Sequence, residues 1–260
     1  MENIIMCPVC GGALFREGGS LKCENGHSFD FAKEGYVNLL LGSRSTERMG
    51  DSRESAAARR AFLEKGYYSC LKEAITPLMR GTVLDICCGE GYYDDAPDGC
   101  TLYGFDLSKT MVRLAAKRKN GGRYFVANLA KIPVFDMSID TAIHLFAPFN
   151  AQEFARVLKT DGRLYSVTPG REHLIEIKHA VYDSPYFNEE KTVECSCLSA
   201  VGSRRVKTKV TVDGDDLHTL FAMTPYYYRT SESDRKKLNN YDKMDVTLDF
   251  VITEYIRSAK

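Results

Sequence analysis

Residues 83–91 read Val-Leu-Asp-Ile-Cys-Cys-Gly-Glu-Gly, and this stretch decides the fold. It begins as an apolar, strand-forming run that carries the acidic residue Asp85 and passes into a turn of small residues. In an open α/β sheet, such a turn lets the backbone approach a ligand closely. The helix expected after the turn would offer free N–H groups to that ligand. The stretch therefore predicts a strand with a ligand-binding loop at its carboxyl end.

Short apolar runs alternate with helical stretches after this loop. The expected strands lie at 83–87, 102–106, 124–127, 141–146 and 163–167. The expected helices lie at 108–119, 151–158 and 172–182. The tail is expected to add strands at 192–199, 205–212 and 245–256 and a helix at 215–223. Alternating strands and helices are typical of an α/β fold with a parallel, doubly wound sheet, which binds ligands beyond the carboxyl ends of its strands.

A second acidic residue, Asp106, follows Asp85 by twenty-one positions and ends the next expected strand. A carboxylate at that place can accept hydrogen bonds from both ribose hydroxyls of a nucleoside. The chain has neither the glycine pattern of dinucleotide sites nor a Walker motif. An acidic strand end repels phosphate and attracts the cationic sulfonium or amino group of S-adenosylmethionine. The sequence therefore predicts an S-adenosylmethionine-dependent methyltransferase, with a glycine-bearing turn of another α/β protein as the alternative.

The loop departs from the usual methyltransferase pattern at Cys87. That pattern has three alternating glycines, and Cys87 occupies the position of the first. A side chain there is expected to crowd the methionine moiety or the turn. Only fourteen residues separate Gly91 from Asp106, which leaves little room for a helix after the loop.

The first 38 residues contain four side chains with the spacing of a metal site. They are Cys7, Cys10, Cys23 and His27. Two close pairs around a hairpin-length insert are how tetrahedral Zn²⁺ sites are built. Four protein ligands leave no open position, so we expect a structural zinc; the alternative is a redox Cys-x-x-Cys pair with an unrelated Cys and His. An odd total of nine cysteines argues against a disulfide framework, and Cys70, Cys100, Cys195 and Cys197 are interpreted as buried or incidental thiols.

The formal net charge of the 260-residue chain is zero, and no apolar run is long enough to span a bilayer. We therefore expect a cytoplasmic protein without a membrane partner. The predicted organisation is a zinc-binding module at 1–38, a linker and helices at 39–80, and a methyltransferase domain at 81–260. Within 39–80 a polar linker is expected at 41–55, followed by two helices broken near Gly66. The regions 44–60 and 204–209 are basic, which suits nucleic acid, although solvated faces are the alternative.

Sequence motifs along nearly the whole chain resemble one enzyme family. They are Cys7–Cys10, His27–Leu40, Gly50–Ser52, Ala58–Leu63, Gly66–Tyr68, Cys88–Tyr93, Asp106–Lys109, Ala147–Pro148 and Thr168–Gly170. In these motifs the chain resembles the RlmA-type large-subunit (23S) rRNA guanine-N1 methyltransferases. The resemblance implies a small N-terminal zinc-binding β module that helps engage rRNA, and a Rossmann-like class I methyltransferase domain with a mostly parallel, seven-stranded sheet. It also implies methyl transfer to N1 of a guanine in a large-subunit rRNA hairpin, and it is compatible with a homodimer.

The resemblance also implies a set of cofactor contacts. Carried over by position, they are Tyr68, Gly89, Glu90 and His173, and the loop and strand ends add Asp85, Gly91, Asp106 and Asn128. Glu90, Asn128 and His173 are candidates for the general base by location, and no single base is assigned. Tyrosines that could stack on a flipped base are Tyr36, Tyr67, Tyr92, Tyr93 and Tyr226–Tyr228, whereas His144 and His218 are expected to be structural. Two other functions stay open: a small-molecule methyltransferase with a zinc lid, and a non-catalytic RNA-binding protein.

Overall fold

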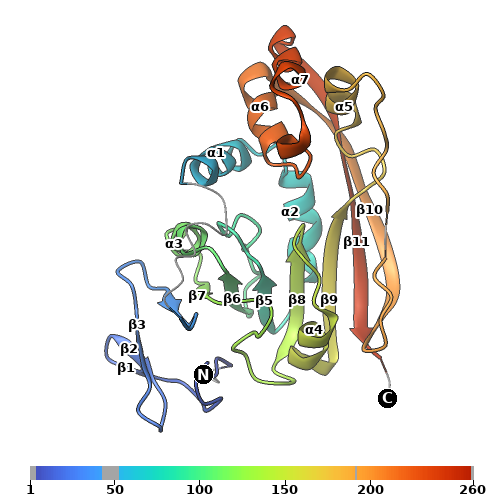
Figure 1. Ribbon diagram of the computed structural model, residues 1–260. Helices are drawn as coiled ribbons and strands as arrows, with labels where there is room; N and C mark the ends of the chain where they lie inside the picture. The colour runs from blue at the N-terminus through green and yellow to red at the C-terminus, as the bar shows by residue number, and fades with distance from the viewer. Residues whose placement is uncertain (1–3, 43–52, 191, 259–260) are drawn as a thin grey trace.

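A computed structural model describes residues 4–42, 53–190 and 192–258. Eight strands form the main sheet in the order β10-β11-β9-β8-β5-β6-β7-β4 (Figure 1). Their bounds are β4 (Val37–Asn38), β5 (Thr82–Ile86), β6 (Thr101–Asp106), β7 (Arg123–Val126), β8 (Ile139–Leu145), β9 (Leu158–Pro169), β10 (Leu198–Asp213) and β11 (Lys243–Arg257). The strands from β4 to β9 run parallel, and β11 is antiparallel to both β9 and β10.

Helices cover both faces of this sheet (Figure 1). Their bounds are α1 (Arg53–Glu64), α2 (Ser69–Ile75), α3 (Lys109–Ala116), α4 (Ala151–Val157), α5 (Ile175–Val181), α6 (Gly214–Ala222) and α7 (Glu232–Lys236). Successive side chains of a strand point to opposite faces. Two buried apolar clusters accordingly lie on the two sides of the sheet. Val83 of β5 belongs to the cluster that includes α2, α5 and α6, and Leu84 belongs to the cluster that includes Phe154 of α4. The central strands are therefore largely apolar on both faces, because both faces are buried.

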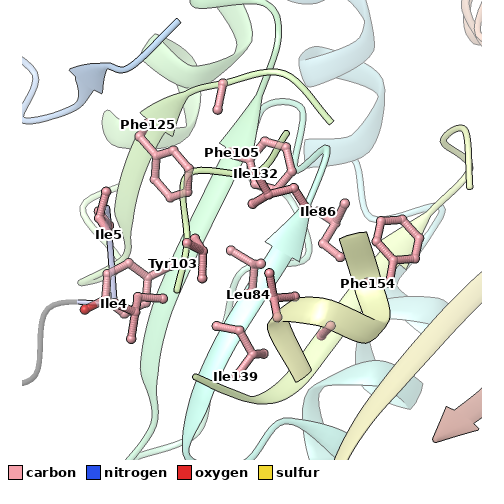
Figure 2. Packing of buried hydrophobic residues seen from close by; sticks show 14 of the residues in the cluster. Ile4, Ile5, Leu84, Ile86, Tyr103, Phe105, Phe125, Ile132, Ile139 and Phe154 are labelled. Carbon is pink, nitrogen blue, oxygen red and sulfur yellow. The ribbon is translucent and has the colours of Figure 1, made fainter. Parts of the chain in front are cut away.

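The N-terminal module shares its core with the sheet. It folds as the antiparallel strands β1 (Phe15–Glu17), β2 (Ser20–Lys22) and β3 (Ser28–Asp30). Figure 2 shows Ile4 and Ile5 in the same buried cluster as Tyr103 of β6 and Phe125 of β7. The Met6 N–H donates to Pro133 O at 3.0 Å, and the Phe135 N–H donates to Ile4 O at 2.9 Å. The module is thus packed against the main sheet and the segment 133–135 through apolar contacts and backbone hydrogen bonds.

The predicted fold class is confirmed, with one strand more than the seven expected. The additional strand is β4, which pairs with the edge strand β7 so that Val37 lies opposite Phe125. Two residues are too few to show the alternation that reveals a strand in sequence. The predicted break between the first two helices is also confirmed, because Gly66 lies between them with a φ of 81°.

Three local expectations are wrong. Residues 192–197 are not a strand, because β10 begins at Leu198, opposite Arg257 where β11 ends, so earlier residues have no partner strand. The prediction of a linker at 41–55 fails at its end, since α1 begins at Arg53; residues 43–52 lie outside the described part. No helix follows the Asp85–Gly91 loop, since residues 87–100 form only turns and irregular backbone. In the described part of the chain, no helix is both long and apolar enough to cross a membrane.

Candidate cofactor cavity and zinc centre

The four predicted zinc ligands come together in the N-terminal module. Their ligand atoms all lie within 4.8 Å of one another. The Cys10 and Cys23 Sγ atoms are 3.7 Å apart, and His27 Nδ1 lies 3.3 Å from Cys23 Sγ and 3.6 Å from Cys7 Sγ. In a tetrahedral site with Zn–S bonds of about 2.3 Å, two sulfur atoms are separated by roughly 3.8 Å. The donor set and its spacing therefore fit a zinc ion held by three thiolates and one imidazole.

Two turns give the zinc ligands this geometry. Gly11 and Gly26 have φ values of 75° and 81°, and their N–H groups donate to Cys7 O and Cys23 O. Glycine adopts this left-handed backbone without steric cost. A side-chain hydrogen bond from Asn25 lowers the pKa of Cys10 to about 6, which favours the thiolate that binds the metal. The turns at Gly11 and Gly26 thus form the two knuckles of the site.

A cavity of about 1230 Å³ opens at the carboxyl ends of the strands β5 to β9. Seven of the eight predicted cofactor residues line it: Tyr68, Asp85, Gly89, Glu90, Asp106, Asn128 and His173. Gly91 does not; a Cβ at this position would lie 3.0 Å from the Ala115 Cβ and from Asp94 Oδ2. The structure therefore brings together segments that are up to 105 residues apart, such as Tyr68 and His173.

Every second residue of the loop from Cys87 to Gly91 has a left-handed backbone conformation. Cys87, Gly89 and Gly91 have φ values of 59°, 55° and 71°. Cys87 thus keeps the left-handed backbone expected of the glycine that it replaces, and its side chain lines the cavity. A non-glycine residue in this conformation costs roughly 1–2 kcal/mol. The departure at Cys87 consequently places a steric cost on the loop.

Replacing Cys87 by glycine is expected to raise the free energy of unfolding by about 1 kcal/mol and the melting temperature by roughly 2–4 °C. The reason is that glycine removes the steric cost of the positive φ. Thermal unfolding followed by circular dichroism measures the change. Cys100→Gly is the matched control, because Cys100 has no positive φ, and glycine there should lower stability by roughly 0.5–1 kcal/mol. A Cys87→Gly protein less stable than the wild type would contradict this account.

Asp85 places an unpaired carboxylate oxygen in the wall of the cavity. Its side chain is buried, and among the described residues its Oδ1 atom has no hydrogen-bond partner. Burial and the negative charge of Asp94 raise the pKa of Asp85 well above its usual value. Burial likewise raises the pKa of Asp94, to about 6. A bound cation would stabilise the charged form of Asp85, so this orphaned oxygen fits the cationic end of S-adenosylmethionine.

Asp106 connects the loop to the end of β6. Its Oδ2 accepts a hydrogen bond from the Gly89 N–H at 3.0 Å, and its Oδ1 accepts one from the Ser108 N–H at 2.8 Å. Each carboxylate oxygen can accept a further hydrogen bond. Asp106 can therefore hold the loop and bind the two ribose hydroxyls at the same time.

Glu90 is buried against an arginine that the sequence did not indicate. Its Oε2 accepts a 2.6 Å hydrogen bond from Arg118 Nη2, and Arg118 Nε donates to Glu90 O at 2.8 Å. Burial nevertheless raises the pKa of Glu90, since it outweighs the opposing effect of Arg118. The Glu90 Oε1 atom is buried and has no hydrogen-bond partner in the described part of the chain. One oxygen is thus fixed by the ion pair, and the other is buried in the described structure without a hydrogen-bond partner.

Tyr68 and His173 also line the cavity and contact each other. His173 Nδ1 accepts a hydrogen bond from the Asp249 N–H at 3.2 Å, which places the ring proton on Nε2. Nε2 lies 3.4 Å from the Tyr68 hydroxyl. Burial lowers the pKa of His173 to about 4. His173 is therefore a neutral donor toward the cavity, which argues against its role as a general base.

His144 and His173 are expected to stay neutral from pH 8 down to about pH 5, because burial lowers the pKa of each to about 4. Unfolded histidine titrates near 6.5, so between pH 6.5 and 4 the unfolded state binds more protons. Each histidine therefore lowers the free energy of unfolding as the pH falls through this window and has no such effect above it. Histidine NMR signals, assigned with His144→Gln and His173→Gln, measure this; titration of either ring near 6.5 would refute it.

Two of the four basic residues of segment 204–209 lie in close ion pairs. Arg205 Nη2 lies 2.6 Å from Asp249 Oδ2, and Lys207 Nζ lies 2.7 Å from Glu172 Oε2. The other two, Arg204 and Lys209, are exposed, so both interpretations of this segment stay predictions. In the other basic region, residues 44–52 lie outside the described part, and Arg59 lines the cavity.

The aromatic and histidine candidates separate into two groups. Tyr92, Tyr93, Tyr226 and Tyr228 line the cavity, whereas Tyr36, Tyr67 and Tyr227 do not. His144 is buried between Ser166 Oγ at 3.0 Å and Pro148 O at 3.1 Å, in agreement with a structural role. The sequence interpretation missed Arg118, Asn188 and Phe146 at or beside the cavity. Only Phe146 carried a signal, since it is the last residue of the strand expected at 141–146, and ligands bind at the carboxyl ends of such strands.

Two protein-family models match the chain. The zinc-ribbon model described as "RlmA, N-terminal" matches residues 5–41, and the model described as "Methyltransferase domain" matches residues 84–166. The first match contains all four ligands of the zinc centre, and the second contains the Asp85–Gly91 loop and Asp106. The predictions of a structural zinc ion and of S-adenosylmethionine as cofactor are confirmed.

Curated relatives match this chain in sequence over two thirds of its length or nearly all of it. YxjB of Bacillus subtilis (strain 168), which carries the name of a 23S rRNA (guanine-N(1)-)-methyltransferase, is 32% identical over 95% of both chains. The 23S rRNA (guanine(748)-N(1))-methyltransferase of Streptomyces fradiae is 34% identical over 85% of this chain and 84% of its own. A Micromonospora griseorubida protein that carries a 23S rRNA guanine-N1 methyltransferase name is 34% identical over 66% of this chain and 68% of its own. With its zinc ribbon, loop and strand order, this chain belongs to the RlmA-type family of 23S rRNA guanine-N1 methyltransferases.

Proposed function

We propose that this protein transfers the methyl group of S-adenosylmethionine to N1 of a guanine in a hairpin of large-subunit rRNA. The observation that carries the proposal is the size of the cavity that the predicted cofactor residues line. Its volume of about 1230 Å³ exceeds the roughly 300–1,000 Å³ that is typical for one small ligand. The cavity thus has room for a nucleoside cofactor and for a base extruded from an RNA stack.

The chemistry needs a donor, an aligned base and a proton acceptor. S-adenosylmethionine, when bound, supplies a methyl group that is already activated by the positive charge on sulfur. Asp106 would hold its ribose, and Asp85 would face its cationic end. Guanine N1 carries a proton that must leave when the N–C bond forms. Of the three candidate acceptors, His173 presents an N–H and Asn128 has a non-basic amide, so Glu90 Oε1 is the remaining unpaired basic atom.

Transfer of labelled methyl groups to a large-subunit rRNA transcript tests the proposal. We expect label in the RNA and one new stop in primer extension, because N1-methylguanine blocks Watson–Crick pairing. A transcript in which that guanine is replaced by adenine should take no label. If the protein binds S-adenosylmethionine in calorimetry but labels no rRNA at any cofactor concentration, the proposed function is wrong.

The division into a zinc module (1–38), linker and helices (39–80) and methyltransferase domain (81–260) belongs to the same proposal. The match of the zinc-ribbon model to residues 5–41 supports the first boundary. In this proposal the module helps to engage the rRNA and the protein acts in the cytoplasm, where it meets its substrate. A homodimer stays a prediction, which light scattering of the purified protein would test.

A further inference from the structure

Phe146 exposes an aromatic ring inside the cavity. It directly follows β8, at the end of the sheet where β5 leads into the Asp85–Gly91 loop. The side chain lines the cavity, yet 45% of the residue remains exposed. A large apolar ring gains free energy when it is buried, by roughly 1.5–3 kcal/mol. Its exposure next to the proposed cofactor site therefore suggests that a ligand covers it.

The backbone of Phe146 is strained in the same way as that of Cys87. Five non-glycine residues have positive φ in the described part, and of these only Cys87 and Phe146 line the cavity. Phe146 has a φ of 55°, a conformation that bulky residues rarely adopt. Its N–H donates to Val167 O of the neighbouring strand β9 at 3.2 Å, which holds the turn. Such strain concentrates at ligand-binding and catalytic sites, where it orients a side chain.

A short series of rings connects Phe146 to the proposed cofactor contacts. Its ring centroid lies 5.7 Å from that of Phe250, with the planes tilted by 52°. The Phe250 ring is in turn 5.3 Å from Tyr68 and 4.8 Å from His173. Phe146 thus lies one ring away from the residues proposed to hold the cofactor.

We propose that the target guanine stacks on Phe146 while its N1 is methylated. This inference rests on the proposed function and adds to it the residue that receives the base. A base leaves its own stack before an enzyme can modify it, and an aromatic side chain replaces the lost stacking. Every base has a π face, so this contact binds and orients the base without selecting guanine.

The test compares Phe146→Ala, Phe146→Tyr and Met137→Ala on an unmodified rRNA hairpin transcript that the wild type methylates. Stacking on an aromatic side chain is worth about 1–3 kcal/mol per base, so Phe146→Ala should lower kcat/KM for the RNA roughly 5- to 150-fold. Phe146→Tyr, which keeps the π face, should stay within about threefold of the wild type. Met137 is the control, because it is 49% exposed with a φ of 51° but lies outside the cavity lining.

Calorimetry with S-adenosylmethionine separates this role from a role in cofactor binding. We expect the Kd of the cofactor to be unchanged in Phe146→Ala, and a parallel loss of cofactor affinity would overturn the inference. Phe146→Gly, which removes the ring and the positive-φ strain together, should match Phe146→Ala in activity while melting at a higher temperature. If the wild type methylates rRNA and Phe146→Ala is as active as Met137→Ala, the stacking role is wrong and the proposed function stands. If the wild type methylates no rRNA, both are wrong.

Discussion

Replacing Asp106 by alanine is expected to weaken the binding of S-adenosylmethionine by about 100-fold or more. The carboxylate accepts hydrogen bonds from the Gly89 and Ser108 N–H groups, so its loss frees the loop as well as the ribose site. Hydrogen bonds to a charged group contribute about 1.5–3 kcal/mol each, and two of them correspond to roughly 10²- to 10⁴-fold in affinity. Isothermal titration with the cofactor measures the change.

Asp98→Ala is the matched control for this prediction. Asp98 is an exposed carboxylate in the same connection between β5 and β6, outside the cavity lining. Its substitution should leave the Kd unchanged. The assignment of Asp106 to the ribose would be wrong if Asp106→Ala bound the cofactor within about tenfold of the wild type, which is a loss of only about 1.4 kcal/mol.

Replacing Cys7 and Cys10 by serine is expected to abolish zinc binding and to unfold the N-terminal module. A unit of this size has too small a core to fold without its metal, and a structural zinc supplies much of its folding free energy. Because Ile4 and Ile5 pack against the sheet, loss of the module should also lower the melting temperature, by roughly 5–10 °C. Methyl transfer to rRNA should fall at least about tenfold if the module helps to engage the RNA.

Cofactor binding should respond differently to the loss of zinc. Every described residue that lines the cavity lies at or after Arg59, so the module contributes none of them. The Kd for S-adenosylmethionine should therefore change little while zinc content, measured by atomic emission, falls to zero. The Cys195→Ser, Cys197→Ser protein is the control, since these half-buried thiols lie outside the metal group. Full rRNA methylation by a zinc-free Cys7→Ser, Cys10→Ser protein would refute a role of the module in RNA engagement.

Short-range patterns in the sequence were enough to predict the metal site, the loop after the first central strand and the central strands themselves. The Cys7–Cys10 and Cys23–His27 pairs each lie within one tight turn, so their spacing alone predicted a metal site, and the ligand atoms do converge. The Asp85–Gly91 loop and Asp106 lie at the carboxyl ends of two adjacent parallel strands, and these ends lie at the same edge of the sheet. The central strands could be located as short apolar runs between helical stretches, because both faces of these strands are buried.

The weaker predictions depended on partners that are distant in sequence. Residues 192–197 have strand-like composition, but the partner strand ends opposite Leu198. The two residues of β4 become a strand only because the N-terminal module docks beside β7. A strand requires hydrogen bonds from a neighbour, and the sequence of the segment itself does not show whether that neighbour is present.

The sequence by itself determined the cluster of zinc ligands, the alternation of strands and helices and the loop proposed to bind the cofactor, because each shows as a local pattern in the chain. Only the tertiary structure decided how these parts act together. It paired Glu90 with Arg118, oriented the His173 ring through the Asp249 N–H and left Phe146 exposed in the cavity. These features follow from side-chain contacts between distant segments, and such contacts exist only once the chain has folded.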